Sequence, residues 1–165
     1  MEYTSSYQSP IGTIILAGAG DALTGLWFHG QKYFGATLSS EHKEADLPVF
    51  SETRRWLDVY FQGQQPDFTP PLAPKGSDFR QAVWDMLLQI PYGQTVTYGT
   101  LAKKLAQQMG LASMSAQAVG GAVGHNPVSL IIPCHRVLGA KGALIGYAGG
   151  VEKKAFLLEL ERSKI

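Results

Sequence analysis

The chain has 165 residues, 45% of them apolar and only 16% charged, which suits a packed core and excludes a disordered charged tail. No apolar stretch approaches the roughly 18 residues that span a bilayer, and the first residues lack the basic and then apolar run of a secretory signal. A single cysteine excludes an internal disulfide and a cysteine-rich zinc site. We therefore expect a cytoplasmic protein without a membrane partner, whose lone thiol is either buried filler or the reactive group.

The net charge of +1 hides a division between the two halves of the chain. Residues 1–74 carry four basic and eight acidic residues, which gives −4. Residues 75–165 carry ten basic and five acidic residues, which gives +5. This asymmetry favours a polyanion as partner of the C-terminal half alone, although chance produces similar patterns in short chains.

A proline-rich segment marks the boundary between the halves. Residues 68–77 hold three prolines and one glycine, and proline blocks both a helix interior and a strand ladder. We therefore predict an N-terminal domain over residues 1–74 and a C-terminal domain over residues 75–165.

The N-terminal half has the pattern of a small α+β unit. Two β-prone runs, residues 12–19 and 23–29, flank Gly20-Asp21, which predicts a hairpin. Ser51 is a candidate N-cap for a helix that Gly63 would end. One face of that helix collects its large apolar side chains: Trp56, Leu57, Tyr60 and Phe61.

The C-terminal half has the pattern of successive helices. Ser77 is a candidate N-cap for a helix that Pro91 would stop, and Thr97 for a helix that Gly110 would end. In the last helix we expect apolar side chains to hold it against the core, namely Phe156, Leu157 and Leu160.

A further short helix, residues 116–123, would begin after Ser113 or Ser115. Together with the helix before it, it fits a helix-turn-helix with the second helix as the recognition helix. Small helical cores also contain such pairs, so the pattern alone leaves DNA binding open. The candidate recognition helix consists almost wholly of small residues, which suits close backbone approach better than readout of base edges in the major groove.

The only cysteine stands in the sequence Pro133-Cys134-His135-Arg136-Val137. A free thiol has a pKa near 8.5, and neighbouring positive charge or a base converts it to the nucleophilic thiolate. His135 is a candidate base, acting directly or through one water. An inert buried thiol beside a hydrogen-bonded core histidine is the alternative for an isolated Cys-His pair.

The wider pattern resembles the O6-alkylguanine-DNA alkyltransferases, also called methylated-DNA–protein-cysteine methyltransferases. Residues 133–137 are similar to the active-site motif of this family, and Asn126-Pro127 precedes them at the matching distance. Further matching segments are Ser9-Pro10-Ile11-Gly12, Ile90-Pro91-Tyr92-Gly93, Thr97-Tyr98, Ala118-Val119-Gly120-Gly121-Ala122, Gly146-Tyr147-Ala148-Gly149-Gly150 and Lys153. The resemblance implies a ribonuclease H-like N-terminal domain before a mainly helical C-terminal domain with a helix-turn-helix.

For the chemistry, the resemblance implies repair of O6-alkylguanine by irreversible transfer of the alkyl group to Cys134, once per molecule and without a cofactor. His135 matches the base that draws the thiol proton through a water, and Glu161 the carboxylate that holds this histidine. Asn126 matches the residue that braces the active-site turn. Whether O4-alkylthymine is also repaired stays open.

For the substrate, the resemblance implies that Tyr98 donates to guanine N3 and that the Ala148 amide donates to O6. The carbonyls of Cys134 and Val137 match acceptors for the guanine amino group, Tyr147 shapes the pocket wall, and Val123 lies where the alkyl chain packs. The family binds double-stranded DNA from the minor groove and flips the guanine out. The positions that match its DNA contacts are Thr97, Gln117, Ala118 and Gly121. We also expect the protein to be a monomer. If the source is bacterial, we expect the protein to be associated with the nucleoid.

One position departs from the family. Gln117 stands where most members carry an arginine that fills the gap left by the flipped base, and glutamine lacks its charge and planar stacking surface. The zinc ligands of some relatives are missing, so we expect no metal and interpret His29 and His42 as surface or core histidines.

Two other functions fit parts of the pattern. Relatives without the cysteine recognise alkylated guanine but do not repair it, and the presence of Cys134 argues against such a sensor. A cysteine hydrolase would use Cys134 and His135 as a pair, although hydrolases seldom place nucleophile and base next to each other in sequence.

Overall fold

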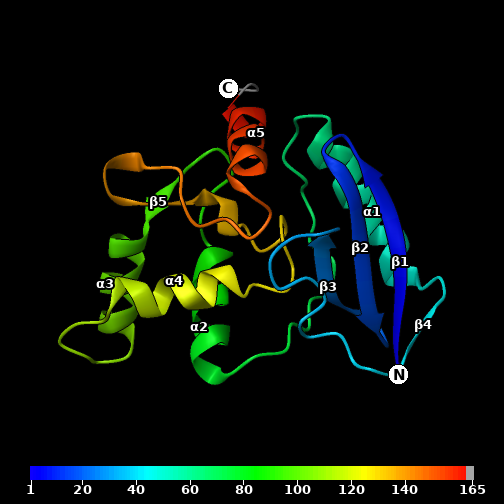
Figure 1. Cartoon of the computed structure of the whole chain (residues 1–165), viewed down its shortest axis with the longest axis horizontal. Coiled ribbons are helices and arrows are strands. Elements are labelled where there is room, and N and C mark those ends of the chain that lie inside the picture. Colours follow the sequence, from blue (N-terminus) through cyan, green and yellow to red (C-terminus); the bar gives the residue numbers. More distant parts are fainter. Residues whose placement is uncertain (163–165) are drawn as a thin grey trace.

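The computed structural model describes residues 1–162 and places a four-stranded sheet in the N-terminal half and most helices in the C-terminal half (Figure 1). The strand order is β3-β2-β1-β4. The strands are β1 (Glu2–Ser9), β2 (Gly12–Ala19), β3 (Ala22–Phe28) and the short β4 (His42–Glu44). β2 is antiparallel to both β1 and β3, whereas β4 pairs with β1 in parallel.

The predicted hairpin is confirmed as β2 and β3, whereas the sequence pattern did not identify β1. That strand contains mostly polar and hydroxyl side chains, so it lacks the apolar alternation that signals a half-buried strand. Its long ladder to β2, from Tyr3 opposite Gly18 to Ser9 opposite Gly12, holds it in the sheet.

The first helix, α1 (Pro48–Phe61), packs against strands β1, β2 and β3. The expectation that Ser51 caps it is wrong, because the helix begins one turn earlier at Pro48. Proline is favoured at a first helical position, since its φ is already helical and its missing N–H needs no partner there. Gly63 follows the helix with φ +80°, in agreement with the predicted stop.

Two segments from outside the sheet pair with the free edge of β3. The Leu23 N–H donates to the Pro71 carbonyl, so the proline-rich segment is tied to the sheet. The Leu26 N–H donates to the Pro127 carbonyl, and the Leu26 carbonyl accepts from the Ser129 N–H. The chain leading to Cys134 is therefore anchored on the sheet of the N-terminal half.

The C-terminal half contains four α-helices among the described residues. Their bounds are α2 (Asp78–Leu87), α3 (Tyr98–Gln108), α4 (Ala116–Gly124) and α5 (Val151–Arg162). Side-chain caps are confirmed at Ser77 for α2 and at Thr97 for α3, and Ser115 rather than Ser113 caps α4. None of the described helices is long and apolar enough to cross a membrane.

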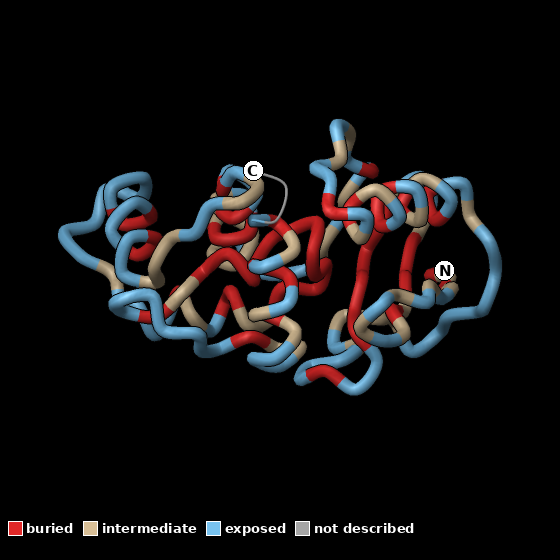
Figure 2. Tube along the Cα trace, turned by 90° about the horizontal axis from the view of Figure 1, so that it is seen from above, coloured by how far each residue is buried: buried red, intermediate tan, exposed pale blue. Residues whose placement is uncertain are grey.

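One hydrophobic core runs through both halves, and Figure 2 shows buried segments on both sides of their junction. The expected inward position of Phe156 is wrong, because this side chain is 39% exposed. α5 instead buries Lys154, Leu157, Leu158 and Glu161, which lie on one face at helical spacing. The last helix therefore carries two ionisable side chains into the core.

Candidate active site

Cys134 begins a short 3-10 turn, η1 (Cys134–Arg136), and is 5% exposed. The Asn126 side chain closes the preceding turn, because its amide donates to the Ile132 carbonyl at 2.8 Å and its oxygen accepts from the Val128 N–H at 3.0 Å. Leu130, in the middle of this turn, has a positive φ of 72°, which costs energy for a residue with a side chain. The buried amide of Asn126 thus holds a strained turn that delivers the thiol.

A buried network surrounds the carboxylate of Glu161. One oxygen, Oε2, lies 2.5 Å from His135 Nε2 and accepts from the Tyr60 hydroxyl at 2.7 Å. Arg136 donates from Nε to Oε1 at 2.8 Å and from Nη2 to Oε2 at 3.1 Å. The Gly93 N–H donates to Oε1 at 3.0 Å. Every partner is a hydrogen-bond donor or His135, so the site is built for an ionised carboxylate.

The network sets the charges of its members. Burial opposes the ionisation of Glu161, but the hydrogen bonds from His135 and Arg136 and the charge of Arg136 outweigh it and hold the pKa at about 2. Burial lowers the pKa of His135, although Glu161 opposes this effect. His135 is therefore neutral at pH 7, and its Nδ1 has no hydrogen-bond partner within residues 1–162. A neutral imidazole with one free nitrogen can accept a proton.

The thiol itself has competing neighbours. Burial raises the pKa of Cys134, whereas the Asn126 side chain and the charge of Lys154 lower it. Lys154 is fully buried on α5 and donates to the Ile145 carbonyl at 2.6 Å. Burial lowers the pKa of Lys154 to about 8. A thiolate at Cys134 would thus form beside a cation that favours it.

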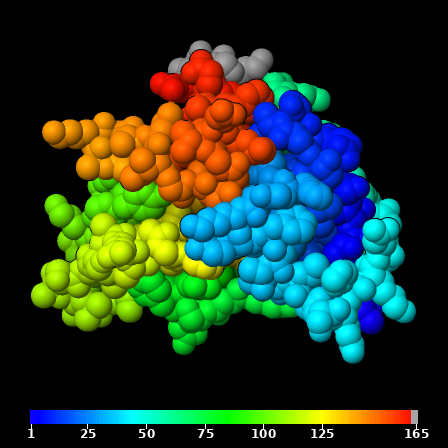
Figure 3. Space-filling view, viewed as in Figure 1, coloured from blue at the N-terminus to red at the C-terminus, as the bar shows by residue number. Residues whose placement is uncertain are grey.

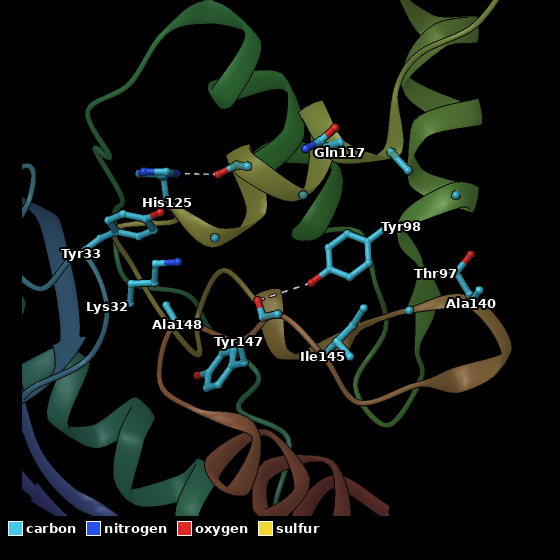
Figure 4. A pocket seen from close by; sticks show the side chains of 17 residues that line it. Lys32, Tyr33, Thr97, Tyr98, Gln117, His125, Ala140, Ile145, Tyr147 and Ala148 are labelled. Carbon is cyan, nitrogen blue, oxygen red and sulfur yellow. Dashed lines mark hydrogen bonds between the residues drawn. The ribbon is translucent and has the colours of Figure 1, made fainter.

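A cavity of about 790 Å³ opens between α3, α4, the loop before α5 and the N-terminal half (Figure 4). It brings together six of the residues predicted for the site: Thr97, Tyr98, Gln117, Gly121, Tyr147 and Ala148. The Tyr98 hydroxyl lies 3.5 Å from the Gly146 carbonyl across the cavity. Figure 4 shows Gln117 on the side opposite Tyr147, so α4 and the loop before α5 face each other.

Seven predicted site residues do not line this cavity, and three of them, His135, Glu161 and Asn126, belong to the buried groups described above. Val123 and Val137 are buried in the core, Ala118 lies exposed on α4 outside it, and Cys134 lies beneath the surface. Cys134 nevertheless belongs to the same buried cluster as Tyr147, which lines the cavity, and a charge on its sulfur would raise the pKa of both Tyr98 and Tyr147. The thiol and the cavity therefore form one site.

Sequence reasoning missed three features of the site. Tyr60 belongs to α1 in the other half, and no local pattern connects it with Glu161. Lys154, not Lys153 of the matching segment, is the buried lysine, while Lys153 stacks over the ring of Phe28. Lys154 precedes Glu161 by seven residues, so helical spacing alone would have placed both side chains on one face.

The third missed feature is a wall contributed by the N-terminal half, where Lys32 and Tyr33 line the cavity.

The two histidines interpreted as surface or core residues, His29 and His42, are both exposed. Within residues 1–162 no group of three or more histidine, cysteine or acidic side chains could hold a metal ion.

Comparison with known families covers nearly the whole chain. Residues 3–74 match the family described as "6-O-methylguanine DNA methyltransferase, ribonuclease-like domain". Residues 78–163 match "6-O-methylguanine DNA methyltransferase, DNA binding domain".

Individual relatives agree with this assignment. The chain is 45% identical over 164 residues to the methylated-DNA–protein-cysteine methyltransferase of Mycobacterium tuberculosis, covering 99% of this chain and 94% of that protein. It is 42% identical over 161 residues to the protein of that name from Haemophilus influenzae, covering 97% and 86%. Among solved structures, the M. tuberculosis O6-methylguanine methyltransferase superposes with a TM-score of 0.84 at 43% identity, covering 100% and 95%. The M. tuberculosis OGT in complex with DNA gives a TM-score of 0.84 at 44% identity, covering 98% and 94%.

Proposed function

Because the chain belongs to the family of methylated-DNA–protein-cysteine methyltransferases, we propose that it repairs O6-alkylguanine in double-stranded DNA by moving the alkyl group to its own Cys134. A sulfur–carbon bond forms while the bond between this carbon and guanine O6 breaks. The product is a thioether, which nothing in the site can hydrolyse, so each molecule acts once.

The observation that carries this proposal is the buried sequence of groups from Glu161 through His135 to Cys134. Glu161 holds His135 through Nε2 and leaves Nδ1 free to take the thiol proton, directly or through one water. Lys154 stabilises the resulting thiolate, and Asn126 holds the turn that presents it. The proton removed from sulfur is balanced by one delivered to the departing guanine.

For the substrate, we assign the cavity to a guanine flipped out of the duplex. Tyr98 would donate to guanine N3 and the Ala148 amide to O6, which stabilises the leaving base. The carbonyls of Cys134 and Val137 would accept from the amino group, with Tyr147 and Val123 around the ring and the alkyl chain. Flipping costs a few kcal/mol, and less for a lesion that already pairs badly.

For the DNA, we propose a minor-groove approach along α4, with contacts from Thr97, Gln117, Ala118 and Gly121 and with the protein acting as a monomer. The small residues of α4 allow its backbone to approach the groove closely. We place the boundary between a sheet domain and a DNA-binding domain between residues 74 and 75. Because its proposed substrate is DNA, the protein would act in the compartment that holds the DNA, which is the nucleoid region of the cytoplasm in a bacterium.

The decisive experiment is an intact-mass measurement after incubation with a duplex that contains O6-methylguanine. We expect a permanent gain of one methyl group in the wild type and none in Cys134→Ser, which should still bind the duplex. Binding without a mass gain in the wild type would identify a sensor of alkylated DNA. Released product with unmodified protein would identify a hydrolase.

A further inference from the structure

The cavity is not made by the C-terminal half alone. One wall comes from the loop that follows β3, through Lys32 and Tyr33. In Figure 3 this loop, in light blue, lies against the yellow end of α4 and the orange loop before α5. The acidic half of the chain therefore contributes to the surface that would receive DNA.

The loop is held in place by its own hydrogen bonds. The buried Gln31 side chain accepts from the Phe28 N–H at 2.8 Å and donates to the Lys32 carbonyl at 3.3 Å. The Lys32 N–H donates to the Ala148 carbonyl at 3.0 Å, across to the C-terminal half. The backbone of Lys32 is thus fixed beside the residue that we assign to guanine O6.

A ring stack joins the loop to the recognition helix. Tyr33 has a positive φ of 61° and stacks on His125 at a centroid distance of 3.8 Å. His125, at the end of α4, contacts the Gly121 carbonyl through Nδ1 at 2.7 Å. The Lys32 amine lies 5.2 Å from the centre of the Tyr33 ring. A residue with a side chain is held in the left-handed region only where its surroundings fix it, as this stack does.

Lys32 is the only lysine or arginine among the described residues that line the cavity, and none of them is acidic. Its side chain is exposed and makes no ion pair within residues 1–162, and Figure 4 shows its amine pointing toward the open centre. α4, which forms the facing wall, contains no charged residue. Among the residues that line the cavity, the one cation that could meet the phosphates of an entering nucleotide therefore comes from the N-terminal half.

We propose that Lys32 binds a backbone phosphate beside the flipped nucleotide, so that the N-terminal half holds the substrate strand. This inference rests on the proposed function. Each phosphate neutralised by a lysine releases counterions, which strengthens binding and makes it depend on salt. The polyanion partner expected for the C-terminal half alone would then be shared by both halves.

The test compares Lys32→Gln with the matched control Lys43→Gln, which removes an exposed lysine of the same half on β4, outside the cavity. Both are made in a Cys134→Ser background, and binding to an O6-methylguanine duplex is measured at several salt concentrations. We expect Lys32→Gln to weaken binding roughly fivefold and to reduce the salt slope by about one. Lys43→Gln should do neither, and Lys32→Arg should keep the wild-type slope.

A second duplex locates the contact. With uncharged methylphosphonates on both sides of the modified guanine, Lys32→Gln should cost no further affinity, as in a double-mutant cycle. An equal loss on both duplexes, or a slope no different from Lys43→Gln, would overturn the assignment of Lys32. Failure of the wild type to gain a methyl group would instead contradict the proposed function, which the salt slopes do not test.

Discussion

At the scale of single residues, the reactivity of Cys134 depends on the pKa of its thiol. Burial raises this pKa, and the Asn126 side chain and the charge of Lys154 lower it. We predict that Lys154→Gln raises the pKa of the thiol and slows alkylation at pH 7 by about tenfold for each unit of the shift. Thiolate absorbance against pH measures this directly, because Cys134 is the only cysteine. Lys153→Gln, which removes the neighbouring charge from the ring of Phe28, is the control and should leave the titration unchanged.

A second prediction at this scale concerns the base. Glu161 fixes the orientation of His135, so Glu161→Gln should slow alkylation roughly 10²-fold, the effect of a misplaced general base. Single-turnover rates against pH give the size of the effect and its pH profile. Glu159→Gln removes an exposed carboxylate of the same helix and should react as the wild type does. An unchanged rate and profile in Glu161→Gln would show that the proton leaves the thiol by another route.

At the scale of elements, α4 carries the departure from the family. Gln117 can hydrogen-bond an orphaned base, whereas arginine would also stack and neutralise phosphate charge. We predict that Gln117→Arg tightens duplex binding and steepens its salt dependence by up to about one phosphate equivalent. Gln62→Arg adds the same charge at the end of α1, outside the cavity, and should have little effect.

The reaction with the free base O6-benzylguanine separates binding from chemistry, since no flipping is needed there. It should change little in Gln117→Arg. If duplex and free base responded equally, Gln117 would act on the pocket or the fold instead of on the flipped-out state.

At the scale of the whole molecule, Tyr60 joins the two halves through its buried hydrogen bond to Glu161. Tyr60→Phe keeps the ring and removes only the hydroxyl, so we expect a loss of about 1.5–3 kcal/mol, as for hydrogen bonds to charged groups. Urea unfolding with an unchanged m-value would measure it. Tyr7→Phe removes an exposed hydrogen bond to Asp58 inside the N-terminal half and should cost clearly less. Equal losses would mean that this buried hydrogen bond between the halves stabilises the fold no more than an exposed one does.

The same carboxylate makes stability depend on pH. The pKa of Glu161 falls from 4.5 to about 2 on folding, which corresponds to roughly 3 kcal/mol. Because the folded pKa is the lower one, this stability is present above pH 4.5 and is lost as the pH falls toward 2. Urea midpoints should therefore drop in this window for the wild type and drop less for Glu161→Gln. A parallel loss in both proteins would assign the acid sensitivity to other groups.

The sequence by itself determined the features that depend on neighbours along the chain. The β2–β3 hairpin, the caps at Ser77 and Thr97 and the small-residue helix α4 follow from local turn, capping and size rules. The motif around Cys134 also identified the candidate nucleophile and its family, because the thiol of Cys134 and its candidate base, His135, are neighbours in the sequence. The α+β class followed from these elements together.

Only the tertiary structure decided which distant side chains meet at the site. Tyr60 reaches Glu161 from 101 residues away, and Lys32 lines a cavity otherwise built by the C-terminal half. β1 enters the sheet through its ladder to β2, although its own sequence is polar. Such contacts result from the packing of one continuous core, which brings together residues that are far apart in the sequence. No local pattern encodes them. Burial then changes the charge state and the partners of a side chain, although the residues next to it in the sequence stay the same.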